Sequence, residues 1–213
     1  MTTSECIAAA GVVVAAVGVI GTWAIAALAL WGDWFKSWFP FLGPALTIEP
    51  VGLSDLITQN NGLKARYYFL RVKNARPRQF PAHEVLLLIT RVEKPDAAGR
   101  PITVFGEPVA LTWVRQETFG NLRTIGWDAD ANLLWVREDG WFQFELMGPG
   151  RPNHFPPPQA SGRADFWVTV QARSIEADSQ PRRFKVAWDG QWQEGTSEIG
   201  KHLVVSLDPP IDR

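Results

Sequence analysis

The sequence holds little of the chemistry from which most catalytic and metal sites are built. Cys6 is its one cysteine, so no disulfide can form within the chain, which favours a reducing compartment. The three histidines, His83, His154 and His202, lie in separate segments. The sequence has no Gly-x-Ser-x-Gly motif, no phosphate-binding glycine loop and no Cys or His pair at zinc-ligand spacing. We therefore expect no catalytic residue, no metal, no cofactor and no enzymatic activity.

An excess of charge of either sign is also lacking. Of the 21 basic and 22 acidic residues, only Glu5, Asp33 and Lys36 precede residue 44, so the remainder carries 20 of each sign. Nucleic-acid binding is disfavoured, because it depends on a net positive surface that neutralises phosphates. No Asn-x-Ser/Thr glycosylation site is present, which agrees with a cytoplasmic or a bacterial location.

Charge is absent altogether from residues 7–31, which also contain no Pro, Asn or Gln. A run of this length can cross a hydrocarbon core of roughly 30 Å as a helix. A cleaved signal peptide is the alternative, since small residues at 24–29 offer a cleavage site. However, residues 1–6 contain no Lys or Arg, and the run is longer than the apolar part of a signal peptide. We expect a short tail over 1–6 and a single transmembrane helix over 7–31.

Aromatic residues crowd the segment 32–44 and its junction with the helix. Rings of this kind prefer the membrane–water interface, so we expect an interfacial segment, with a buried junction against the following domain as the alternative. Small residues within the helix recur on one face and allow a second helix to approach, which predicts a homo-oligomer or a helical protein partner. The interfacial residues are Trp31, Trp34, Phe35, Trp38 and Phe39, and the helix-association residues are Gly11, Ala15, Gly18 and Thr22.

Orientation in the membrane follows from the basic residues, which are lacking before the helix and present after it at Lys36 and over 64–78. Because basic flanks stay in the cytoplasm, we expect the C-terminal domain there rather than in the periplasm or outside the cell. The run over 64–78 holds six basic residues and no acidic one. Contact with anionic lipid is one interpretation, and a charged edge strand is the other. The candidate lipid contacts are Lys64, Arg66, Arg71 and Lys73.

From residue 45 to residue 213, a long 3.6-residue apolar period is missing, and short β-branched and aromatic runs alternate with Gly, Pro, Asn and Asp. This pattern is typical of an all-β sandwich, and we expect an immunoglobulin-like antiparallel β-sandwich. Asp139-Gly140 and Asp189-Gly190 are expected at hairpin tips, and 148–158 as an irregular, proline-rich segment. The predicted strands are 45–49, 64–73, 84–93, 108–115, 122–127, 132–137, 141–146, 165–173, 182–188 and 202–207.

Two further groups invite a binding interpretation. Seven tryptophans over 45–213 are expected mostly in the core, but Trp188 and Trp192 would stack on a sugar or another flat ligand if exposed. Asp128-x-Asp130-x-Asn132 resembles the start of a calcium loop, although Leu133 stands where that loop needs glycine. We therefore expect a solvated turn at 128–132 in place of a calcium site.

Three strings carry a resemblance: YYFLRVKN (67–74), PAHEV (81–85) and WDGQW (188–192). With them the chain resembles uncharacterised bacterial proteins that have one N-terminal transmembrane helix and an immunoglobulin-like domain. The resemblance implies a fold and a prokaryotic membrane setting, and it implies no reaction.

These observations predict a membrane-anchored, non-enzymatic interaction or accessory module, acting alone or as a subunit of a larger membrane complex. A β-sandwich that binds a carbohydrate or another ligand through exposed tryptophans is the alternative function. The bilayer and a protein are the expected partners.

Overall fold

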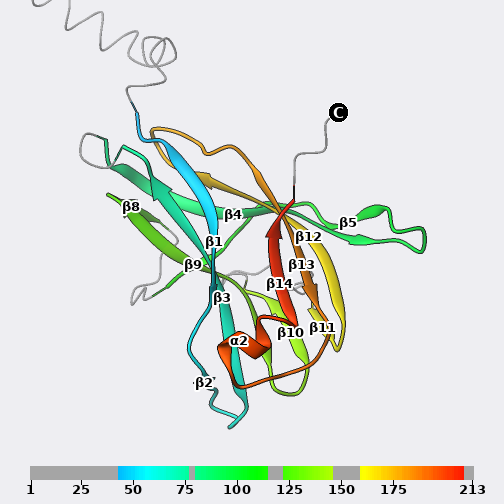
Figure 1. Cartoon of the computed structure of the whole chain (residues 1–213). Coiled ribbons are helices and arrows are strands. Elements are labelled where there is room, and N and C mark those ends of the chain that lie inside the picture. The colour runs from blue at the N-terminus through cyan, green and yellow to red at the C-terminus, as the bar shows by residue number, and fades with distance from the viewer. Residues whose placement is uncertain (1–42, 77–79, 115–121, 146–158, 209–213) are drawn as a thin grey trace, which may run out of the picture. The chain divides into compact units, whose positions relative to one another are not determined.

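The structure, a computed structural model, describes residues 43–76, 80–114, 122–145 and 159–208 (Figure 1). The predicted tail, transmembrane helix, helix-association residues and interfacial aromatics lie outside the described residues, as does the segment 148–158. Within the described part of the chain, no helix has the length and apolarity needed to cross a membrane.

Residues from Pro44 onward form two antiparallel sheets. Sheet 1 has the order β1-β3-β9-β10-β11, with β2 beside β3 and β7 beside β9. Its strands are β1 (Leu46–Leu53), β2 (Ile57–Thr58), β3 (Lys64–Asn74), β7 (Thr112–Trp113), β9 (Asp128–Arg137), β10 (Trp141–Phe144) and β11 (Gln159–Ser161).

Sheet 2 has the order β14-β13-β12-β4-β5, with β6 and β8 also beside β4. A short helix, α2 (Thr196–Ile199), lies in the connection from β13 to β14. The strands of sheet 2 are β4 (Ala82–Pro95), β5 (Pro101–Phe105), β6 (Val109–Ala110), β8 (Arg123–Ile125), β12 (Ala164–Arg173), β13 (Arg182–Trp188) and β14 (Leu203–Leu207).

The core lies where the inner faces of the two sheets meet. Alternate residues of β3, β9 and β12 are buried, as expected of strands with one face against a core and one toward solvent. Phe142 and Phe144 of sheet 1 pack against Phe166 of sheet 2, with ring centroids 5.6 and 5.7 Å apart. Two antiparallel sheets joined by one apolar core fit a β-sandwich.

The predicted strands are confirmed, since each predicted range overlaps a strand, whereas β2, β5 and β11 were not predicted. The predicted turn at 128–132 is wrong, because β9 already begins at Asp128 and pairs with β3 as far as Lys73. The predicted edge position of 64–73 is also wrong, because β3 lies between β1 and β9.

Of the two predicted hairpin tips, one is confirmed. Asp139-Gly140 joins β9 to β10, with Gly140 at φ +80°. Asp189-Gly190 is not a tight hairpin, because the chain runs through α2 before it returns as β14.

Three glycines meet at one end of the two sheets. Gly140, Gly162 and Gly190 have φ values of +80°, +87° and +86°, which L side chains rarely adopt. The carbonyl oxygen of Gly140 accepts hydrogen bonds from the Gly162 N–H at 3.0 Å and from the Trp188 indole N–H at 3.3 Å. A side chain on Gly190 would place its Cβ 2.9 Å from the Cα of Gly162, so the close approach of these backbones depends on glycine.

Gly190→Ala is expected to destabilise the protein more than Gly99→Ala. Both positions have positive φ, which costs an alanine about 1–2 kcal/mol, but a Cβ at Gly99 meets nothing within 4 Å. The clash at Gly190 adds about 1–3 kcal/mol. Urea denaturation of the full chain, followed by tryptophan fluorescence, measures the difference. Equal losses in the two variants would contradict the close approach.

Candidate interaction surfaces

The basic side chains of β3 are paired with other groups of the same chain. Lys64 forms an ion pair with Glu194, and Lys73 forms one with Glu49 at 2.6 Å. The guanidinium of Arg71 donates two hydrogen bonds to Asp130, at 2.6 and 2.9 Å. For Lys64, Arg71 and Lys73 lipid contact stays a prediction, with each positive charge already beside a carboxylate.

Lipid contact is wrong for Arg66, which is only 5% exposed. Its Nη1 donates to the carbonyl oxygen of Ser54 at 2.6 Å and to the hydroxyl of Thr196 at 3.1 Å, and its Nη2 donates to the carbonyl oxygen of Glu194. Arg66 therefore joins β3 of sheet 1 to the β13–β14 connection. Its role in the structure is to hold these two parts together.

The acidic positions of the calcium-like string bind arginine. Asp128 and Asp130 project from the outer face of β9 toward Arg71, whose Nε lies 3.7 and 2.6 Å from their carboxylates. In the described residues no group of three or more His, Cys, Asp or Glu side chains could hold a metal ion.

Two of the histidines lie in the described chain. Nδ1 of His202 lies 2.7 Å from Oδ2 of Asp189, and the other carboxylate oxygen of Asp189 accepts the backbone N–H of Gln191 at 2.8 Å. His83 is exposed, and its backbone N–H donates to Glu176 at 3.0 Å. His154 lies outside the described residues. The Asp189–His202 pair connects the two ends of the β13–β14 connection.

Ligand stacking on Trp188 is wrong, because its ring is 1% exposed and its N–H is bound to Gly140. Trp192 is half-buried and packs against the core, with its indole nitrogen buried. Trp188 and Trp192 therefore do not form the exposed pair of rings that ligand stacking would need.

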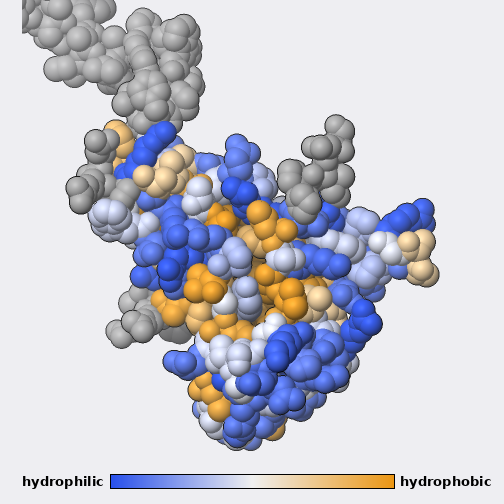
Figure 2. Space-filling view, viewed as in Figure 1, coloured by the Kyte–Doolittle hydropathy of each residue, from blue (hydrophilic) through white to orange (hydrophobic). Residues whose placement is uncertain are grey.

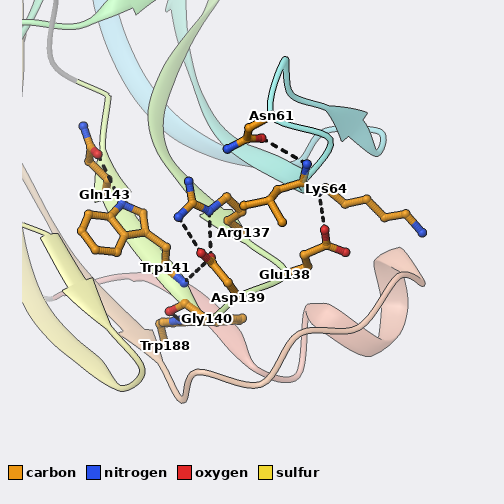
Figure 3. Close-up of polar contacts among 10 residues, drawn as sticks. Asn61, Lys64, Arg137, Glu138, Asp139, Gly140, Trp141, Gln143 and Trp188 are labelled. Carbon is orange, nitrogen blue, oxygen red and sulfur yellow. Dashed lines mark hydrogen bonds and ion pairs between the residues drawn. The ribbon is translucent and has the colours of Figure 1, made fainter.

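A different set of aromatic residues lies on the outer face of sheet 1. Tyr67, Trp135 and Gln143 are neighbours on three adjacent strands, because Tyr67 pairs with Trp135 and Trp135 pairs with Gln143. Trp141 lies on β10 with its indole N–H donating to Gln143 at 3.3 Å (Figure 3). All four side chains are half-buried. We call these residues, together with Arg137, the aromatic face.

Arg137 lies at the centre of the aromatic face. Its guanidinium carbon is 5.8 Å from the ring centroid of Trp135 and 5.7 Å from that of Trp141, within the range of cation–π attraction. Two hydrogen bonds to Asp139, at 2.8 and 2.5 Å, fix its direction (Figure 3). These hydrogen bonds raise the pKa of Arg137 and hold the pKa of Asp139 below its usual value.

Tyr67 extends the aromatic face toward β1. Its pKa is raised, first by burial of the phenol and then by the nearby carboxylate of Glu145. The phenol thus stays neutral over the physiological pH range, and the aromatic face presents three aromatic rings, the amide of Gln143 and one arginine paired with Asp139.

A groove lies between the two sheets where β1 and β14 run close together. Its volume is about 330 Å³. Figure 2 shows apolar side chains gathered over this region, where Val51, Val204 and Leu207 are 44–49% exposed. The residues that line the groove are Gly52, Leu53, Tyr68, Thr196, Gly200, Leu203, Val204 and Val205.

Comparison of the chain with family models, curated proteins and solved structures gave no match. The two antiparallel sheets are compatible with the β-sandwich part of the expected fold.

The Arg137–Asp139 contact predicts a pH-dependent stability difference. A lowered folded-state pKa means that ionised Asp139 stabilises the fold above its unfolded pKa of about 4, and that this contribution is lost as pH falls through the folded value. Asp139 is 40% exposed, so Asp139→Asn is expected to cost less than about 1 kcal/mol at pH 7. Denaturation at pH 7 and pH 3 measures this cost, which should shrink at pH 3.

A double-mutant cycle isolates the Arg137–Asp139 contact. In a chain that already carries Arg137→Gln, Asp139→Asn should cost clearly less at pH 7 than it does in the parent chain. A cost that is the same in both backgrounds and at both pH values would contradict the contact.

Proposed function

We propose that the protein is a membrane-tethered, non-enzymatic binding module. A transmembrane helix over 7–31 anchors an immunoglobulin-like β-sandwich domain on the cytoplasmic side, and the aromatic face of sheet 1 binds a protein partner. The protein serves as an accessory module or a subunit of a larger membrane complex.

The aromatic face carries this proposal. The outer face of an antiparallel sheet usually presents polar side chains to water, yet here Tyr67, Trp135 and Trp141 lie around one arginine. Tyrosine, tryptophan and arginine are the residues most enriched among the energetically dominant positions of protein interfaces. Because Asp139 already neutralises Arg137, the partner surface that fits is largely uncharged, apolar or aromatic.

A protein partner fits the aromatic face better than a carbohydrate. Sugars stack on open aromatic rings, whereas the guanidinium of Arg137 lies close to the rings of both Trp135 and Trp141. The stacking pair expected from the sequence also fails at Trp188, which is buried. A protein surface can pack around the Trp–Arg–Trp group as it stands.

Site-specific crosslinking tests the binding surface. A photo-reactive phenylalanine analogue in place of Gln143 is expected to give a discrete protein adduct in cells. In a second chain the same analogue replaces Thr169, which lies on the outer face of sheet 2, and no such adduct is expected. Adding Trp135→Ala to the first chain should remove the adduct. Equal adducts from the two positions, or none from Gln143, would overturn the assignment of this face.

Membrane attachment has its own test. After alkaline carbonate washing, the full chain is expected in the membrane pellet, because 25 uncharged residues favour lipid over water. A chain lacking 7–31 should move to the supernatant. Protease added outside intact spheroplasts should leave the β domain uncut. An intact full chain in the supernatant would rule out the tether, and cleavage of the domain would reverse the orientation.

A further inference from the structure

Two apolar side chains protrude from turns at the same end of the sheets. Of the large apolar side chains in the described residues, Ile175 and Trp127 are the most exposed, at 68% and 63%. Trp127 lies between β8 and β9, and Ile175 lies between β12 and β13. Both turns flank the start of β4, because Ile125 pairs with Ala82 and the Ile175 N–H donates to the carbonyl oxygen of His83 at 3.3 Å.

The chain enters the β domain at this same end, and the buried side chain of Asn74 holds the entry in place. Its Oδ1 accepts the Ala45 N–H at 3.2 Å, and its Nδ2 donates to the carbonyl oxygen of Phe80 at 2.7 Å. The backbone N–H of Asn74 donates to the carbonyl oxygen of Trp127 at 2.8 Å. The turn that carries Trp127 is therefore fixed beside the start of β1, and α2 lies at the opposite end of the sheets (Figure 1).

A lipid surface is the partner that fits protruding apolar side chains at this place. The inference rests on the tether proposed above, since the predicted helix over 7–31 and the predicted interfacial segment over 32–44 lead directly into residue 45. The end of the sheets that holds Ala45 is thus the end joined to the bilayer. Tryptophan prefers the membrane–water interface, because its ring is apolar and its N–H is polar.

The nearby charges favour a lipid surface without net charge. Glu84 and Glu176 are exposed, and the carboxylate of Glu176 accepts the His83 N–H at 3.0 Å, close to Ile175. These carboxylates would repel anionic headgroups. Contact with lipid would therefore come from burial of apolar surface, for which a phosphatidylcholine interface suffices.

We propose that Trp127 and Ile175 enter the interfacial layer of the bilayer, so that the end of the β domain that holds Ala45 rests on lipid. The contact adds a second attachment to the tether and fixes which end of the domain faces the membrane. Trp141 of the aromatic face follows Gly140 at the opposite end. Lipid contact and the proposed partner binding therefore use different surfaces.

Site-directed fluorescence in the full chain tests the lipid contact. In a Cys6→Ser background, Gly126→Cys carries an environment-sensitive nitrobenzoxadiazole label beside Trp127, where an added Cβ meets nothing within 4 Å. The chain is reconstituted into phosphatidylcholine vesicles with iodide on both sides of the membrane. We expect blue-shifted emission that nitroxide-labelled lipid quenches and iodide does not. The matched control Ser197→Cys, exposed on α2 at the opposite end, should be quenched by iodide alone.

Two further arms separate lipid contact from the tether. Adding Trp127→Ser and Ile175→Ser to the Gly126→Cys chain should remove the blue shift and the lipid quenching, while vesicle flotation shows that the chain is still anchored. A floating chain whose label at residue 126 behaves like the label at residue 197 would overturn the lipid contact and leave the tether standing. A label shielded from both quenchers would point to a protein surface and also overturn it. A chain that does not float would overturn the tether itself. Urea denaturation confirms that each variant is folded.

Discussion

The whole structure depends on the two-residue period of β-strand side chains and the need to cover one face of each sheet. Once Leu70, Phe142 and Phe144 turn inward to meet Phe166, the residues between them must face outward. Trp135 and Trp141 are therefore placed on the outer face, half-buried, by the same register that buries their neighbours. The aromatic face is thus a direct consequence of the core.

The end of the molecule near α2 is held by polar and backbone contacts. Arg66 connects β3 to the β13–β14 connection through carbonyl and hydroxyl oxygens, and Trp188 reaches across to the backbone of Gly140. Both contacts link sheet 1 to sheet 2. They fix the connection that leads into β14.

Strand positions could be predicted from the sequence because β-branched and aromatic runs bounded by turn residues are a local signal. The start of β9 could not be predicted in this way, because its Asp and Ala residues are weak strand formers. In the structure Asp130 is paired with Arg71 on β3, a contact that a local pattern does not reveal. The carboxylates that pair with the basic residues of β3 could not be predicted either, because a partner such as Glu194 lies far away in the sequence. Choosing Trp135 and Trp141 over Trp188 required the register, which single-strand patterns leave open.

The order of strands in sheet 2 also bears on how the chain folds during synthesis. β4 is the longest strand of the described residues and its apolar residues pair with β12, which the ribosome makes only after β5 through β11. Such non-local pairing is slow, and until it forms the edge of β4 that β12 joins has no neighbouring strand. The apolar strand β4 thus waits with one unpaired edge during synthesis until β12 is made.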